Sequence, residues 1–451
     1  MIRLHPKPQV QHACPHCREA LAVKDWWIPG MRMLAVLDCP RCARQFYGDL
    51  PAGHGLYYPM LLEAGTGEVH DAQGVPWFAE WLRDSFAGRV DEPVPFAEEE
   101  FRPIRRPLLL NCLDQLYGHS LLKLLNAQYY LDHHPDQDLI VLIPRFLRWL
   151  VPKGVAAVWT VDLPLRKGNT WNDWLAKRLH EKIDSFAEAF LSVALSHPHP
   201  DDFAIERFTG IAPFDTARWT ELLAQRPTVT FIWREDRLWE AARSRVGSEL
   251  RRWRNQAGRA VLGAQSGATI QARPQERLVA QLGLRLRQSF PGLDFAVAGL
   301  GQRGRLPQWI SDMRESEVDE SIERAWCQRY ACSHLVVGVH GSNMILPSAH
   351  AGAVLELLPP DRWGNLLQEI LPRTADPRDA LIRFRFLPLP SGVAAVAEAA
   401  VALLQDVPIA ALNYNRPWCD HQTATNQPGL LAQKRQAIAG SIRSAQQPPN
   451  S

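Results

Sequence analysis

The 451-residue sequence contains no uninterrupted apolar run of about 18 residues, the length that a membrane-spanning helix needs. Its first residues are polar and include Pro6 and Pro8, so they lack the apolar core of a signal peptide. The chain also lacks an excess of charge of one sign, because its net charge is only +2. A global electrostatic attraction to nucleic acid or to a membrane is therefore absent. We expect a soluble, cytoplasmic protein without a membrane span.

Cysteine is scarce as well, since eight residues in 451 are too few for a disulfide scaffold. Four of them form two Cys-x-x-Cys pairs, which are Cys14 with Cys17 and Cys39 with Cys42. Two such pairs place four thiolates around one tetrahedral Zn²⁺ at about 2.3 Å and leave no open position. The spacing predicts a structural zinc ribbon in residues 1–50, with free thiols or a redox pair as alternatives.

The charge around this ribbon decides between its possible partners. Residues 1–50 carry seven Lys and Arg against four Asp and Glu, whereas residues 51–105 carry four against ten. The combined charge is −3, and nucleic-acid binding normally needs a basic face. We therefore expect the ribbon to have a structural role or to dock a protein partner, and we expect no nucleic-acid partner.

The rest of the chain alternates short apolar runs with helical patterns. Apolar runs at 138–144, 156–161 and 228–233 are typical of buried parallel strands. Helical spacing follows residue 120, and a further helix is predicted over 174–195. This alternation indicates Rossmann-like α/β domains. The predicted organisation is a zinc ribbon (1–50), a connecting segment (51–104), an acceptor Rossmann-like domain (105–225), a donor Rossmann-like domain (226–385), a closing helix with a return segment (386–415) and a flexible tail (416–451).

One stretch combines the features of a ligand-binding turn. A buried strand at 335–339 precedes His340, Gly341, Ser342 and Asn343, and a second strand contains Glu356. Ligands of open α/β sheets collect at the carboxyl ends of the strands, and a turn that starts a helix presents backbone N–H groups to an anion. The stretch predicts a phosphate site in which Glu356 holds sugar hydroxyls. An ordinary βα turn and an exposed strand-end acid are the alternatives.

Arginine is concentrated just before that turn. Residues 226–314 contain 16 Arg, no Lys and seven acidic residues, a net charge of +9. Guanidinium groups bind phosphate oxygens in a bidentate manner. Arg234 and Arg237 leave the end of a predicted strand and are the best candidates to bind a diphosphate, although a solvated surface pair is the alternative.

A catalytic base is expected in the first Rossmann-like domain. His119 follows Gly118 at a predicted helix start, and its imidazole could accept a proton from an acceptor hydroxyl near neutral pH. A capping or core histidine is the alternative. Asp114 and Asp132 are the carboxylates that could serve as the base instead.

These motifs resemble those of glycosyltransferase family 61. The run from Val337 to Asn343, followed by Gly352 to Leu357, is similar to its V-G-x-H-G-A-x and V-x-E-[LI] signatures. The segment 231–237 is similar to I-x-R-x-x-x-R, and 118–121 to an early segment with an aromatic residue and His. The resemblance covers roughly 105–400 and departs from the family at Ser342 and Asn343, where Ala and Gly are usual. It also departs at Lys123 and the apolar residues nearby, where an acidic residue is common.

The resemblance implies a GT-B fold, with two Rossmann-like domains preceded here by the ribbon. It also implies an inverting glycosyltransferase that moves a sugar from a nucleotide-sugar donor to a glycan or protein acceptor. Zn²⁺ would be structural, and no catalytic metal is expected. The alternative function is a catalytically inactive GT-B-like binding or scaffold protein that docks through its ribbon.

Overall fold

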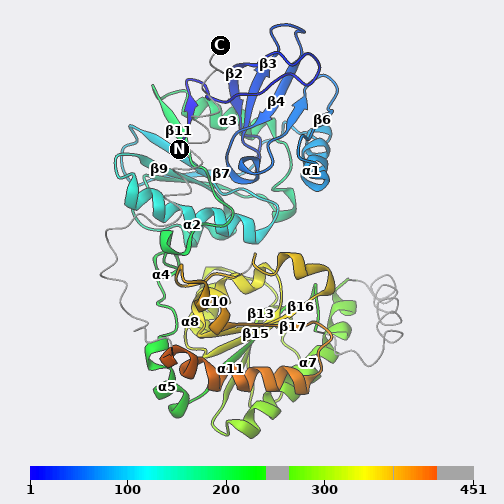
Figure 1. The fold of residues 1–451 in the computed structure, drawn as a ribbon, viewed down its shortest axis with the longest axis vertical. Helices are drawn as coiled ribbons and strands as arrows, with labels where there is room; N and C mark the ends of the chain where they lie inside the picture. Colours follow the sequence, from blue (N-terminus) through cyan, green and yellow to red (C-terminus); the bar gives the residue numbers. More distant parts are fainter. Residues whose placement is uncertain (240–263, 369, 414–451) are drawn as a thin grey trace. The chain divides into compact units, whose positions relative to one another are not determined.

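The computed structural model describes residues 1–239, 264–368 and 370–413. The chain divides into two compact units, Met1–Pro198 with Asp202–Gly210, and His199–Asp201 with the chain from Ile211 onward. Many of the helices and strands of each unit are labelled in Figure 1. The predicted ribbon and connecting segment fall in the first unit, together with the first Rossmann-like sheet. The predicted tail, 416–451, and the end of the segment 386–415 lie outside the described residues.

The first unit contains a six-stranded sheet in the order β1-β11-β8-β9-β10-β7. The four inner strands are parallel, and β1 and β7 pair with them antiparallel at the edges. Every residue of β8, β9 and β10 is buried, as expected for strands covered on both faces. The strands are β1 (Ile2–His5), β7 (Phe96–Glu100), β8 (Pro107–Asn111), β9 (Asp138–Pro144), β10 (Ala157–Val161) and β11 (Ala189–Leu191).

Helices follow these strands, and one of them corrects the sequence-based expectation. The helix α2 (Tyr117–His133) packs on β8 and β9. The helix predicted over 174–195 is α3 (Asp173–Ile183), which begins where the Asn172 side chain accepts a hydrogen bond from the Leu175 amide at 3.2 Å. The prediction was wrong at its end, because β11 pairs between β1 and β8 within that span.

A second, antiparallel sheet in this unit has the order β2-β3-β4-β5-β6. Its core is continuous with that of the first sheet, since Cys14, Cys39 and Phe46 belong to the same buried cluster as Leu109 and Leu142. The cysteine-bearing segment therefore packs on the Rossmann-like sheet, while Leu34 and Leu62 of the small sheet belong to a second buried cluster with Phe78, Leu82 and Phe86. The elements are β2 (Ala22–Trp27), β3 (Leu34–Asp38), β4 (Gln45–Asp49), the 3₁₀ helix η1 (Gly53–Leu56), β5 (Leu61–Glu63), β6 (Val69–His70) and helix α1 (Pro76–Ala87).

The second unit is built on an entirely parallel sheet in the order β14-β13-β12-β15-β16-β17. Numbered along the chain, this order is the 3-2-1-4-5-6 arrangement of a Rossmann sheet. The strands are β12 (Thr228–Trp233), β13 (Asp294–Leu300), β14 (Ser311–Glu315), β15 (Leu335–Val339), β16 (Ala353–Leu358) and β17 (Phe384–Pro388).

The helices of this unit cover the sheet. Helix α11 packs against α7 and against β15, β16 and β17 (Figure 1). It buries Val396, Ala400, Leu403, Leu404 and Val407, which recur at helical spacing along one face. The described α-helices of this unit are α5 (Trp219–Gln225), α7 (Ala264–Ser289), α8 (Glu320–Ala331), α9 (Ile345–His350), α10 (Pro377–Arg383) and α11 (Val393–Asn413), whereas the short helix α4 (Glu206–Thr209) belongs to the first unit.

The predicted fold class is confirmed: two Rossmann-like α/β units follow one another in the chain, and a small β sheet near the N-terminus lies along the chain between β1 and the other strands of the first unit's Rossmann-like sheet. None of the described helices combines the length and the apolar character that crossing a bilayer requires.

Candidate functional site

The second unit has its topological switch point between β12 and β15, the strands from which the chain proceeds to opposite edges of the sheet. Ligands of such sheets bind outside the carboxyl ends of the strands at this point. Arg234 directly follows β12, and His340 directly follows β15. Two of the predicted donor-binding residues therefore leave adjacent strands at the point where a ligand is expected.

The two arginines clamp the turn that follows β15. Arg234 Nη1 donates to the His340 carbonyl at 3.0 Å and to Asn343 Oδ1 at 2.8 Å. Arg237 Nη1 donates to the same carbonyl at 3.1 Å. Arg234 also donates from Nε and Nη2 to the two carboxylate oxygens of the exposed Asp236. Arg234 is thus already engaged on several sides, and Arg237 has the lighter set of hydrogen bonds.

Gly341 is required by this close approach. Its backbone has φ of 148° and ψ of 175°, a conformation that side-chain-bearing residues rarely adopt. A Cβ atom built there would lie 2.2 Å from Arg234 Nη1. Ser342 then begins a 3₁₀ turn, η6 (Ser342–Met344), that leads into α9.

His340 and Glu356 contact each other in the interior. His340 Nδ1 lies 2.5 Å from Glu356 Oε2, and the two side chains are 1% and 0% exposed. The pair therefore links the turn after β15 to the neighbouring strand β16. The roles predicted for both residues in binding a donor stay predictions. Their contact means that His340 Nδ1 and Glu356 Oε2 already bind each other.

Positive charge accumulates beside this turn. Burial lowers the pKa of Arg237, and the charges of Arg234 and Arg362 lower it further, against the opposing effect of Asp236 and Asp361. Cations that repel one another in a partly buried site are stabilised by an added anion. The electrostatics of the turn therefore favour a negatively charged ligand.

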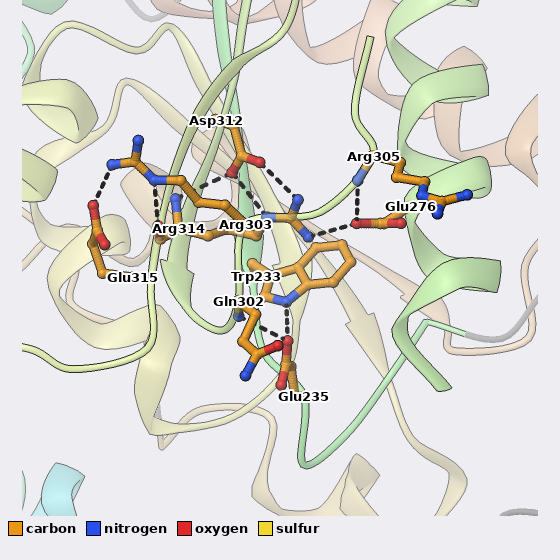
Figure 2. Close-up of polar contacts among 9 residues, drawn as sticks. All are labelled: Trp233, Glu235, Glu276, Gln302, Arg303, Arg305, Asp312, Arg314 and Glu315. Atoms are coloured by element: carbon orange, nitrogen blue, oxygen red, sulfur yellow. Dashed lines mark hydrogen bonds and ion pairs between the residues drawn. The ribbon is translucent and has the colours of Figure 1, made fainter. Parts of the chain in front are cut away.

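A second set of side chains fixes the end of β12 and the loop after β13, as Figure 2 shows. The fully buried Arg314 binds Asp312 and Glu276, and its guanidinium carbon lies 4.4 Å from the centre of the Trp233 ring. Glu235 accepts hydrogen bonds from Trp233 Nε1 at 3.3 Å and from the backbone N–H of Gln302 at 3.1 Å. Sequence reasoning missed this network, because its members are scattered over 233–315 without a repeating spacing.

The first unit has its own switch point, between β8 and β11. Asp114 and His119 follow β8 there. The predicted connecting segment reaches the same place, because the Gly53 amide donates a hydrogen bond at 2.7 Å to the carbonyl of Val193, just after β11. This contact brings His54 beside His119. The connecting segment therefore contributes to the same site as the predicted base.

Four side chains form the cluster. His119 Nδ1 lies 3.4 Å from Asp114 Oδ1 and 3.3 Å from His54 Nε2. Lys123 Nζ donates to Asp114 Oδ2 at 2.8 Å and to the Leu113 carbonyl at 3.0 Å. His119 retains 17% side-chain exposure, whereas Asp114 and Lys123 are buried. The two histidines are the partly exposed members of the cluster, so a substrate could reach the ring of His119.

The charges within the cluster determine its protonation. Burial alone would raise the pKa of Asp114, but the Lys123 ammonium and the His119 ring hold it below its usual value. Burial lowers the pKa of His54 to about 3, and the Lys123 charge acts in the same direction. The cluster thus contains an ionised carboxylate and a neutral His54 at neutral pH, an arrangement in which Asp114 can orient His119.

Sequence reasoning placed Asp114 and His119 together but missed His54 and Lys123. His54 lies 65 positions before His119, inside the predicted connecting segment, and the two glycines that flank it are the only feature of the local sequence that sets it apart. Asp132, the other candidate base, pairs on the surface with Arg207 at 2.5 Å. The structure does not bring it to this cluster.

The four cysteines of the predicted ribbon converge. Their four Sγ atoms all lie within 4.8 Å of one another, and the Sγ–Sγ distance is 3.7 Å for Cys14 with Cys42 and 3.5 Å for Cys17 with Cys39. Tetrahedral ligands at about 2.3 Å from Zn²⁺ are roughly 3.8 Å apart. The sulfur arrangement therefore fits a tetrahedral Zn²⁺.

The two cysteine turns also have matching backbones. In the first, the Arg18 amide donates to the Cys14 carbonyl and Arg18 has φ of 61°. In the second, the Ala43 amide donates to the Cys39 carbonyl and Ala43 has φ of 56°. A left-handed residue at the same place in each turn directs both pairs of sulfurs to one point.

No family model matches the chain, and no curated protein matches it. Among solved structures, it is similar to the ADP-heptose LPS heptosyltransferase II of E. coli, with 10% identity, 67% of this chain and 98% of that chain covered, and a TM-score of 0.34. It is also similar to a putative UDP-N-acetylglucosamine 2-epimerase from Listeria monocytogenes, with 9% identity, coverage of 77% and 99%, and a TM-score of 0.35. At these values the likenesses carry no argument about activity, and the fold rests on the sheet topology.

The lowered pKa of His54 predicts a pH dependence of stability. Unfolded His54 takes up a proton as the pH falls below about 6.5, whereas the folded residue does so only near pH 3. Its contribution is therefore complete above pH 6.5 and is lost as the pH falls toward 3, at up to about 1.4 kcal/mol per pH unit. In chemical denaturation at a series of pH values, His54→Gln should lose stability less steeply than the wild type over this range. His133→Gln, at an exposed helix end, should follow the wild type; identical curves for His54→Gln and wild type would contradict the assignment.

Proposed function

We propose that this chain is an inverting glycosyltransferase, which moves a sugar from a nucleotide-sugar donor to an acceptor hydroxyl. The observation that carries the proposal is the cationic turn at the switch point of the second sheet, where Arg234 and Arg237 meet the His340 carbonyl. A diphosphate has the charge and the size that such a site favours. The resemblance of the same residues to family 61 motifs supports the sugar nucleotide over other anions.

The two arginines have different tasks in this proposal. Arg234 positions the turn, because it is bonded to His340, Asn343 and Asp236 at once. Arg237 supplies the charge that binds the diphosphate and stabilises it as the leaving group. Ser342 and Asn343 begin the next helix, so their backbone N–H groups add further donors for a phosphate oxygen.

The acceptor hydroxyl is activated in the first unit. His119 removes its proton while Asp114 accepts a hydrogen bond from the ring, which stabilises the imidazolium that forms. The oxygen then attacks the anomeric carbon, the bond to the diphosphate breaks, and the configuration at that carbon inverts. The leaving group departs as a nucleoside diphosphate held by the cationic turn. The acceptor is proposed to be a glycan or a protein.

We also propose that Cys14, Cys17, Cys39 and Cys42 hold a structural Zn²⁺, which the convergence of their sulfurs supports. Because these turns share a core with the first sheet, the metal would stabilise the unit that contains His119.

Replacing Arg237 should weaken donor binding. A thermal-shift and calorimetric screen with nucleoside diphosphates should find at least one that stabilises the wild type, by about 2.7 kcal/mol at 100 times its Kd. Arg237→Ala should raise that Kd by about 10- to 100-fold, the cost of a charge-assisted hydrogen bond. Arg218→Ala removes a surface arginine that pairs with Glu221 and should bind like the wild type. If no nucleotide shifts the wild type, a scaffold role is favoured and the transferase proposal fails.

Replacing His119 should separate chemistry from binding. With the nucleotide sugar whose nucleotide binds best, His119→Ala should lower kcat by about 10²- to 10⁴-fold, the usual contribution of a general base. Its Kd for the nucleotide should stay unchanged, because the proposed role of His119 is to accept the acceptor's proton and not to bind the nucleotide. His133→Ala serves as the matched control and should retain full turnover. A His119→Ala enzyme with wild-type kcat would exclude this residue as the base.

A further inference from the structure

Three groups of side chains in the described part of the chain have a composition that could hold a metal ion. The first is the set of four cysteines. The second, His54 with Asp114 and His119, belongs to the proposed proton-transfer site, and the buried Lys123 ammonium already binds its carboxylate at 2.8 Å. The third is His16 with Glu63 and His70, for which neither the sequence nor the proposed transfer reaction supplies a role.

We propose that His16, Glu63 and His70 form a second metal site, which binds a divalent first-row transition ion such as Zn²⁺. One ligand atom from each residue lies within 4.8 Å of the other two. His16 Nε2 and Glu63 Oε2 are 3.0 Å apart, close to the roughly 3.3 Å that separates two ligands at about 2.0 Å from a tetrahedral ion. Two imidazoles and one carboxylate suit such an ion better than Mg²⁺ or Ca²⁺.

One buried nitrogen of His70 is available to bind a metal ion. His70 Nε2 is inaccessible to solvent and has no hydrogen-bond partner in the described structure. A buried polar atom in that state is destabilising unless something binds it. Since His70 Nδ1 faces Glu68 at 3.9 Å, Nε2 is the nitrogen left for a metal ion.

The strands of the small sheet explain why these residues meet. Glu63 ends β5 and pairs across the sheet with Phe46, while His70 ends β6 and pairs with Leu61. Side chains two positions apart on a strand point to the same face, so Glu63 and Leu61 share a face of the sheet. His70 lies directly opposite Leu61 on the neighbouring strand, so its side chain is on that face as well. The rings of His16 and His70 are 5.5 Å apart, so the first cysteine turn lies over that face.

The surroundings resemble the outer shell of a metal site. Arg44 Nη1 binds Glu63 Oε1, the oxygen that does not contact His16. The Glu68 carboxylate lies 3.9 Å from His70 Nδ1, the ring nitrogen that would not bind the metal. Carboxylates commonly orient histidine ligands from this position. The Glu63 side chain is 5% exposed and that of His16 is 34% exposed, so the site is enclosed but open to solvent on one side.

Three protein ligands leave a position for water or for a donor atom of a bound molecule, unlike the closed set of four cysteines. The ion would also join the first cysteine turn to the β5–β6 hairpin. The site therefore differs from a structural Zn²⁺ both in ligand type and in its accessibility to small chelators.

The test counts metal ions in the full chain, produced without a histidine tag and titrated with Zn²⁺ or Co²⁺ after removal of bound metal. His70→Phe keeps a ring of similar size but removes the ligand, and it should bind one equivalent fewer than the wild type. Glu63→Gln should weaken binding of the same equivalent by at least about 10- to 100-fold. His133→Phe, at an exposed histidine stacked on Tyr129, should match the wild type.

Cobalt distinguishes the two sites and reports on folding. The Co²⁺–thiolate absorption of the cysteine site should be unchanged in His70→Phe, which shows that the small sheet is intact. If His70→Phe loses that absorption, its fold is disturbed, and the metal count and affinity of Glu63→Gln are compared with those of the wild type instead. Equal metal counts and affinities in the wild type and an intact variant would overturn the proposal.

Discussion

The buried contact between His340 and Glu356 is the constraint on which the proposed donor site depends. A carboxylate placed in the interior is costly unless it is paired and hydrogen-bonded. Glu356 achieves this by binding the ring of His340, which belongs to the turn after the neighbouring strand. Because Glu356 fixes the ring of His340, the His340 carbonyl is held where Arg234 and Arg237 can donate hydrogen bonds to it. Gly341 then allows the guanidinium of Arg234 to approach the backbone.

The two units use the same topological position in different ways. At the switch point of the second sheet the side chains are mainly cationic, and the like charges favour an anion. At the switch point of the first sheet an ionised Asp114 is shared by Lys123 and His119, with a neutral His54 alongside. The first arrangement suits binding and charge stabilisation, whereas the second suits proton transfer. A glycosyl transfer from an activated donor needs both.

Much of the fold could be predicted from local pattern. The strands β9 and β12 were found at their observed bounds because each is a short apolar run between polar or turn residues. The strand β11 was not found, because its three residues extend a helical pattern and become a strand only by pairing with β1 and β8. The cysteine cluster followed from spacing alone, since two matching turns must share ligands.

The candidate site could be predicted only in part. Arg234 and His340 were identified because each directly follows a strand, and Arg237 because it lies three residues after Arg234; parallel strands bring their carboxyl ends together. The contact of Glu356 with His340, the approach of His54 and the pairing of Lys123 with Asp114 depend on tertiary packing. No spacing in the sequence encodes these contacts. The same holds for His70, which is brought to His16 by the β5–β6 hairpin.

The location of the donor is the central claim, and hydrogen exchange of the full chain tests it most directly. Exchange would be compared with and without the nucleoside diphosphate that stabilises the protein most. The account predicts slower exchange in peptides covering 233–239 and 340–345, with no change in the cysteine turns or at 111–123. Protection confined to the first unit, or no protection at the turn after β15, would contradict it.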